Sequence, residues 1–279
     1  MIRGREVAAV ARLELGDVLR SRWLAFAGVV YALLAAVFVL VGVRESMLFG
    51  FTGMGRVLFS FCHALVLLLP LLALTATGQV VNRAREDGTL ELLFSHPVGR
   101  PAYFLAVALV RYLVLALPLV AAMVLMALAG RLAFRQAMPW PFLVRASLVS
   151  ASLILAFVGV GLLISTVVRN PARALMYLLL VWAAAVALID VGLIGLMLQW
   201  RLPPQALFVI AAANPVQSAR MALLSGADTE LGVLGPVGFF LANRVGDGAL
   251  YALGVAWPAL LGLGCLGVAL QRFRRGDLV

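Results

Sequence analysis

The stretch ASLVSASLILAFVGVGLLISTVV, residues 146–168, decides the class of fold because its 23 residues include no charge. About 20 apolar residues in a helix are enough to cross the ~30 Å hydrocarbon core of a bilayer. The polar turn Arg169–Arg173 follows directly, and a second apolar run begins after it. The alternation of apolar runs and polar turns predicts a chain that crosses a membrane several times.

Working outward from this stretch, five more apolar runs have the length of a span, which gives six predicted spans at residues 24–43, 57–78, 102–129, 146–168, 174–198 and 249–270. The chain is 64% hydrophobic and only 12% charged, whereas globular domains carry about 25% charged residues. We therefore predict an all-α integral membrane protein, with residues 1–279 forming a single transmembrane domain.

The segments before the first span and after the fifth are predicted to hold shorter helices. Residues 1–23 predict an amphipathic helix with an apolar side of Val7, Ala8, Ala11, Leu15, Val18 and Leu19. Such a helix can lie in the membrane interface, or it can be a solvated N-terminal helix. In the segment 199–248, Asn214 and Pro215 predict a helix start and Gly226 a helix end. We expect short outer helices there, with the apolar run Leu231–Leu241 too short to span.

The distribution of arginine predicts the orientation. With six spans, the termini and the loops on their side hold 13 arginines in about 60 residues, and the opposite loops hold 8 in about 80. Positive charge marks the cytoplasmic side, so both termini are predicted to be cytoplasmic. A five-span layout would require one of the six spans to be wrong.

The composition also argues against several classes of function. All 22 basic residues are arginine, so the chain lacks the lysine of a phosphate-binding loop and is not expected to hydrolyse ATP. Its net charge of +10 suits lipid headgroups rather than nucleic acid. Cys62 and Cys265 are far apart, and neighbouring Cys62 and His63 point about 100° apart on a helix. We predict no metal site, no bound cofactor and no catalytic residue.

The polar segment 79–101 separates the second and third predicted spans. Asp87 can cap a short helix, in which Leu90, Leu93 and Phe94 form an apolar face and Pro97 prevents continuation. Two turns are not stable alone in water, so this face must be buried. A groove in a cytoplasmic partner and the chain's own spans are the two candidate surfaces.

Arg111 and Asp190 are the charges placed well inside predicted spans. Ionisable groups inside a membrane cost roughly 2.5–3.5 kcal/mol and face a cavity or a partner. The two residues could contribute to a polar lining at a dimer interface. Alternatively, Arg111 reaches inward to the headgroups and Asp190 lies near the outer interface.

The segment Glu86–Leu93, followed by Pro97-Val98-Gly99-Arg100, resembles the E-x-G-T-L-E-L-L-L-S-x-P-V-S-R segment of ABC-2-type transporter permeases, with Gly99 in place of the usual serine. The resemblance implies a bacterial or archaeal cytoplasmic membrane and a permease dimer with two ATPase subunits, which bind the ATP and Mg²⁺. It also implies a coupling helix that inserts into the ATPase, formed by Glu86, Asp87, Gly88, Thr89, Leu90, Glu91, Leu92, Leu93, Phe94, Pro97 and Arg100.

Within this family, the sequence from Leu92 to Arg100 and the outer motif of Asn214, Pro215 and Arg220 are most similar to those of permeases that serve nitrous oxide reductase maturation. That similarity implies a periplasmic β-helical partner and a role in assembly of a copper–sulfur centre. Export of another substrate (lipid, drug or ion) is the alternative. An ATPase-independent secondary carrier and an intramembrane enzyme are further alternatives from other classes.

Overall fold

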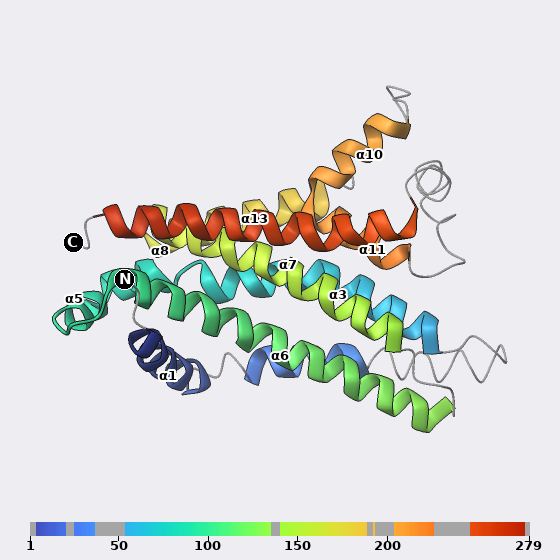
Figure 1. Cartoon of the computed structure of the whole chain (residues 1–279), viewed down its shortest axis with the longest axis horizontal. Helices are drawn as coiled ribbons and strands as arrows, with labels where there is room; N and C mark the ends of the chain where they lie inside the picture. Colours follow the sequence, from blue (N-terminus) through green and yellow to red (C-terminus); the bar gives the residue numbers. More distant parts are fainter. Residues whose placement is uncertain are drawn as a thin grey trace.

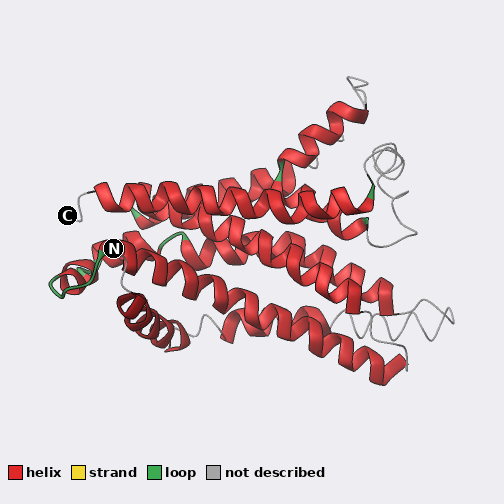
Figure 2. Ribbon diagram, in the orientation of Figure 1, coloured by secondary structure: helices red, strands yellow, loops and turns green. Residues whose placement is uncertain are grey.

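The computed structural model describes residues 4–20, 25–36, 54–134, 140–188, 192, 204–225 and 246–276. Within these ranges the chain forms helices joined by turns, without a strand (Figure 2). The elements are α1 (Gly4–Arg20), α3 (Met54–Thr77), α4 (Val80–Glu86), α5 (Thr89–Phe94), α6 (Arg100–Phe134), α7 (Trp140–Val167), α8 (Pro171–Ala183), the π-helical turn η1 (Ala184–Leu188), α10 (Pro204–Ala213), α11 (Pro215–Leu224) and α13 (Asp247–Arg275). A further helix covers Ala25–Ala36.

Four of these helices are long and apolar enough to cross a membrane, and up to six spans result if each of two bent helix pairs counts as one. The bent pairs are α1 with Ala25–Ala36, at 61°, and α10 with α11, at 111°. The all-helical, multi-span character predicted from the sequence is confirmed. The layout of six separate spans stays a prediction.

The long helices lie side by side in one bundle, with α7 at its centre (Figure 1). In the most apolar part of α7, 61% of the residues are buried within the chain, against 22% in α13. Helix α7 therefore supplies the core, while α13 packs by one side and leaves Leu260 and Leu263 exposed on the other. In a membrane protein, that exposed apolar side faces lipid or a second protein.

The crossing of α7 and α13 depends on two glycines. A Cβ atom added to Gly159 would lie 2.4 Å from the carbonyl oxygen of Gly262, and one added to Gly262 would lie 2.5 Å from that of Leu155. Small residues let the backbones of two membrane helices approach closely. Because both clashes involve backbone atoms, a side-chain rotation cannot relieve them.

Two helices extend beyond the predicted spans. The sequence places residues 130–145 between two spans, as a loop, but α6 continues to Phe134 and α7 already begins at Trp140. Pro141 fits there because a proline is tolerated in the first turn of a helix, where its missing N–H costs nothing. Arg145 consequently lies within a helix and not in a loop. The end of the predicted fifth span and the run Leu231–Leu241 lie outside the described residues.

The apolar side of α1 is also arranged differently from the prediction. Val10 and Val18 are buried, with Val18 packed on Val110 and Val114 of α6. Leu15 and Leu19, which were expected on the same apolar face, are exposed. The helix is therefore rotated so that part of its apolar side contacts α6 and part remains uncovered.

Candidate functional site

The short helices α4 and α5 project from the same end of the bundle as the C-terminal end of α13 (Figure 1). Gly88 joins the two helices in a left-handed conformation with φ of +69° and stands at the N-cap position of α5. The sequence had assigned this capping role to Asp87, which instead caps the C-terminus of α4. A position with positive φ favours glycine, because a residue with a Cβ atom is strained in this backbone conformation.

The apolar face of α5 packs on the chain's own helices, which is the second of the two surfaces that the sequence left open. Leu90 is 1% exposed. The Phe94 ring contacts Tyr103 of α6 edge-on, at a centroid distance of 5.9 Å, and Phe273 of α13 at 6.3 Å. Leu93 is partly buried against the same core. These side chains hold α5 in place and leave its opposite face outward.

The outward surface of α5 and its flanks is polar, with one large apolar side chain. Leu92 is 72% exposed. The other exposed residues among those predicted for ATPase coupling are Glu86, Asp87, Thr89, Glu91 and Pro97. Among the residues proposed for ATPase coupling, these are the ones that a partner can reach directly. We refer to Leu92 and these five residues as the α5 surface.

Arg100 ties this end of the bundle to the end of α13. Its Nη1 donates hydrogen bonds to the carbonyl oxygens of Arg274, at 3.2 Å, and Gly276, at 3.1 Å. The last carbonyls of a helix have no partner within the helix, so Arg100 satisfies groups that would otherwise depend on water. Arg100 thereby connects the start of α6 to the end of α13.

The intramembrane charge Arg111 pairs with Glu14 of α1. Arg111 Nε and Nη2 donate to Glu14 Oε1 at 2.9 and 2.6 Å, and the two side chains are 17% and 12% exposed. The sequence prediction gave Glu14 no role, because the residues around Glu14 do not show that α1 packs on α6 beside Arg111. Asp190, the other predicted intramembrane charge, lies outside the described residues.

We expect Arg111→Met to destabilise the protein by about 2 kcal/mol, because it leaves the Glu14 carboxylate partly buried without its charged donor. Thermal unfolding of the purified protein in detergent measures the effect. The matched variants are Glu14→Gln and the double variant Glu14→Gln/Arg111→Met. If the pair acts directly, the double variant loses less than the sum of the single ones. Strictly additive losses would contradict the pairing.

Asn214 and Pro215 start α11 as the sequence predicts. Pro215 lies in its first turn, and the Asn214 side chain accepts a hydrogen bond from the Val216 amide at 2.9 Å. Asn214 Nδ2 also donates to the Ala185 carbonyl in η1 at 2.6 Å. A π-helical turn disturbs the regular pattern of backbone bonds, and this contact connects it to the start of α11. Arg220 Nη1 donates to Gln217 Oε1 at 3.3 Å.

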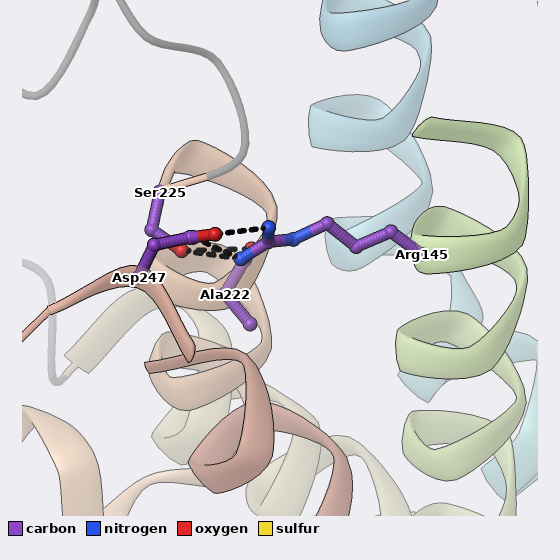
Figure 3. Close-up of polar contacts among 4 residues, drawn as sticks. All are labelled: Arg145, Ala222, Ser225 and Asp247. Atoms are coloured by element: carbon purple, nitrogen blue, oxygen red, sulfur yellow. Dashed lines mark hydrogen bonds and ion pairs between the residues drawn. The ribbon is translucent and has the colours of Figure 1, made fainter. Parts of the chain in front are cut away.

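At the other end of the bundle, Arg145 of α7 contacts residues at the end of α11 and at the start of α13 (Figure 3). From α7, its guanidinium donates to both carboxylate oxygens of Asp247, at 2.5 and 2.9 Å. It also donates to Ser225 Oγ at 2.7 Å and to the Ala222 carbonyl at 2.9 Å. Its Cζ lies 4.8 Å from the ring centroid of Tyr251. This arrangement fixes the end of α11 and the start of α13 on α7.

Replacing Arg145 by methionine is expected to cost about 2 kcal/mol, since the buried groups at the end of α11 lose their donor. We expect a lower unfolding temperature and faster proteolysis near Ser225. Arg131→Met is the control, because Arg131 is exposed near the C-terminal end of α6. Equal unfolding temperatures and proteolysis rates for the two variants would show that the Arg145 contacts do not stabilise the fold.

Within the described ranges, no group of three or more His, Cys, Asp or Glu side chains is arranged to hold a metal ion. Met123 and Met126 are 1% and 4% exposed and belong to the apolar core. Polar groups that the structure brings together include the α5 surface at one end and the Arg145 contacts at the other.

The described residues form a bundle of long apolar helices, with the short helices α4 and α5 between α3 and α6. The family described as ABC-2 family transporter protein matches residues 8–278 of the chain. The chain therefore belongs to this family, as predicted from the segment 86–100. It is a multi-pass permease of an ABC transporter, a class that works with an ATPase subunit.

Two curated relatives carry the same description, "Probable ABC transporter permease protein NosY". The protein from Stutzerimonas stutzeri is 28% identical over 258 residues, which cover 90% of this chain and 93% of the relative. The protein from Pseudomonas aeruginosa is 30% identical over 238 residues, covering 80% and 82%. The predicted similarity to this branch of the family is confirmed.

Proposed function

We propose that this chain is the non-catalytic membrane subunit that couples ATP hydrolysis in a separate ATPase to work across the membrane. The observation that carries the proposal is the α5 surface, which lies on a short helix whose Phe94 packs on Tyr103 of α6 and Phe273 of α13 and whose Leu90 is buried. A rigidly mounted helix can transmit movement from a bound partner. In this proposal the α5 end faces the cytoplasm, and two permease copies bind two ATPases.

The similarity to proteins described as NosY supports a role in assembling the copper centre of nitrous oxide reductase. The chain would then export a component of that centre or act mechanically on a periplasmic β-helical partner. The contacts of Arg145 and Asn214 suit such a role, because they link α11 to α7, α13 and η1 at the end of the bundle opposite α5.

The test uses a strain that lacks the chromosomal copy and makes nitrous oxide reductase. The permease, supplied with its ATPase, should restore the copper–sulfur absorption bands of the purified reductase and should co-purify with the ATPase. An ATPase variant that binds but does not hydrolyse ATP is the matched control and should restore neither activity nor spectrum. If the ATPase binds but the reductase matures without the permease, the chain exports another substrate. If no ATPase binds, the coupling proposal is wrong.

A further inference from the structure

A cavity of about 410 Å³ lies between α4, α5 and the turn that joins α7 to α8. Its lining carries charges of both signs, with Arg85 and Arg169 as cations and Glu86 and Glu91 as anions. The buried, uncharged side chain of Asn82 also lines this cavity. Two buried donor atoms of this lining, Asn82 Nδ2 and Arg85 Nε, have no hydrogen-bond acceptor among the described residues.

Asn82 is fully buried, and only half of its amide is used. Its Oδ1 accepts from the Arg83 backbone N–H at 2.9 Å. Ser165 Oγ of α7 accepts from the backbone N–H groups of Val81 and Asn82 at 2.8 and 3.4 Å, which holds this turn of α4 against α7. Asn82 Nδ2 has no hydrogen-bond acceptor among the described residues. A buried donor without an acceptor costs about 1–3 kcal/mol.

Arg85 presents a second unused donor. Its Nη1 donates to the Thr166 carbonyl at 3.3 Å, near the end of α7, while its buried Nε has no described acceptor. Arg169, in the turn after α7, adds a second guanidinium to the lining. Two donors without an acceptor among the described residues, Asn82 Nδ2 and Arg85 Nε, lie beside the Arg169 guanidinium, and together these groups favour a ligand rich in acceptor oxygens. A phosphate group suits them, because guanidinium groups bind its oxygens in a fixed planar geometry.

We propose that this cavity binds the headgroup of a phospholipid that carries a primary ammonium, such as phosphatidylethanolamine. Its phosphodiester would lie at Asn82, Arg85 and Arg169, and its ammonium at Glu86 and Glu91. Glu86 and Glu91 determine which phosphate-containing ligand fits the cavity. A free phosphate is repelled by them, and an anionic phospholipid leaves them without a partner, whereas a zwitterionic headgroup matches both signs.

The position of the cavity supports a lipid ligand. Helix α7 has 28 residues, which at 1.5 Å per residue gives about 42 Å, longer than the ~30 Å hydrocarbon core. Its ends therefore reach the headgroup layers. The cavity lies at one such end, where Val167 closes α7 and Pro171 opens α8.

The test measures which lipids the full-length chain retains. The protein is reconstituted in nanodiscs containing equal amounts of phosphatidylethanolamine, phosphatidylcholine and phosphatidylglycerol, and native mass spectrometry follows the bound lipid. We expect about tenfold preferential retention of phosphatidylethanolamine, equivalent to 1.4 kcal/mol. Arg85→Gln/Arg169→Gln should abolish retention. Glu86→Gln/Glu91→Gln should keep a bound phospholipid but lose the preference over phosphatidylcholine, whose quaternary ammonium donates no hydrogen bond.

Arg83→Gln is the matched control, because Arg83 lies on α4 but lines a different cavity, and it should retain the lipid like the unchanged chain. If the double arginine variant does not fold, Arg169→Gln alone replaces it, since Arg169 is exposed. Unchanged retention in the folded arginine variant would overturn the proposal, as would preference for phosphatidylglycerol or displacement by 10 mM inorganic phosphate. The chain is tested without its ATPase, because Glu86 and Glu91 also belong to the α5 surface.

Discussion

Gly262→Leu is expected to prevent accumulation of folded protein. A Cβ atom at this position would lie within 2.8 Å of the Ala156 amide nitrogen and 2.5 Å of the Leu155 carbonyl oxygen, so α13 would have to move away from α7. Overpacking a core costs about 1–3 kcal/mol even when side chains can adjust, and here backbone atoms would have to move. We expect a loss of about 3 kcal/mol or more, seen as aggregation in size-exclusion chromatography after detergent extraction.

Gly264→Leu provides the matched control on the same helix. Nothing lies within 4 Å of a Cβ atom added to Gly264, so the same change of residue should leave the protein folded. The contrast removes any effect of helix propensity or of added hydrophobicity, which both variants share. If Gly262→Leu behaves like Gly264→Leu, the close crossing of α7 and α13 is wrong.

Leu92→Asp is expected to give a folded permease that no longer binds its ATPase. The side chain is 72% exposed at the centre of the α5 surface, so a carboxylate there is solvated in the free protein. In the complex, loss of a central apolar contact typically costs 2 kcal/mol or more, which corresponds to about 30-fold weaker binding, and a desolvated charge adds to the loss. The ratio of ATPase to permease after affinity purification measures the effect.

Leu90→Asp should behave differently, because Leu90 is 1% exposed and its replacement places a charge in the packing between α5 and the bundle. Loss of folded protein, and not loss of binding alone, is expected for that variant. Leu132→Asp is the control for an exposed leucine far from α5, on the last turn of α6. An unchanged ATPase ratio in Leu92→Asp would show that the ATPase does not bind through the α5 surface.

The sequence predicted those features that depend on a short run of residues. Long apolar runs define helices whatever their neighbours are, and a capping residue such as Asn214 acts on the N–H groups next to it. The position of α5 between two spans was predicted for the same reason. The surface that covers Phe94 was not predicted, because it comes from Tyr103 and the distant Phe273.

The polar pairs could not be predicted, because they join residues that are far apart along the chain. Glu14 and Arg111 are separated by 97 positions, and Arg145 and Asp247 by 102. Neither member of a pair shows locally which helix it will face. Arg145 was assigned to a loop because a charge and two prolines precede the span, although prolines in a first helical turn are compatible with a helix.

The hydrogen bonds from Arg100 to the end of α13 have a practical consequence for handling the protein. They place Gly276, the last described residue, at the end of the bundle that carries the surface to which we assign the ATPase. An affinity tag or fluorescent protein fused to the C-terminus is therefore expected to interfere with ATPase binding. Purification through a tag on the ATPase avoids this interference, and it selects for complexes in which the two proteins have already assembled.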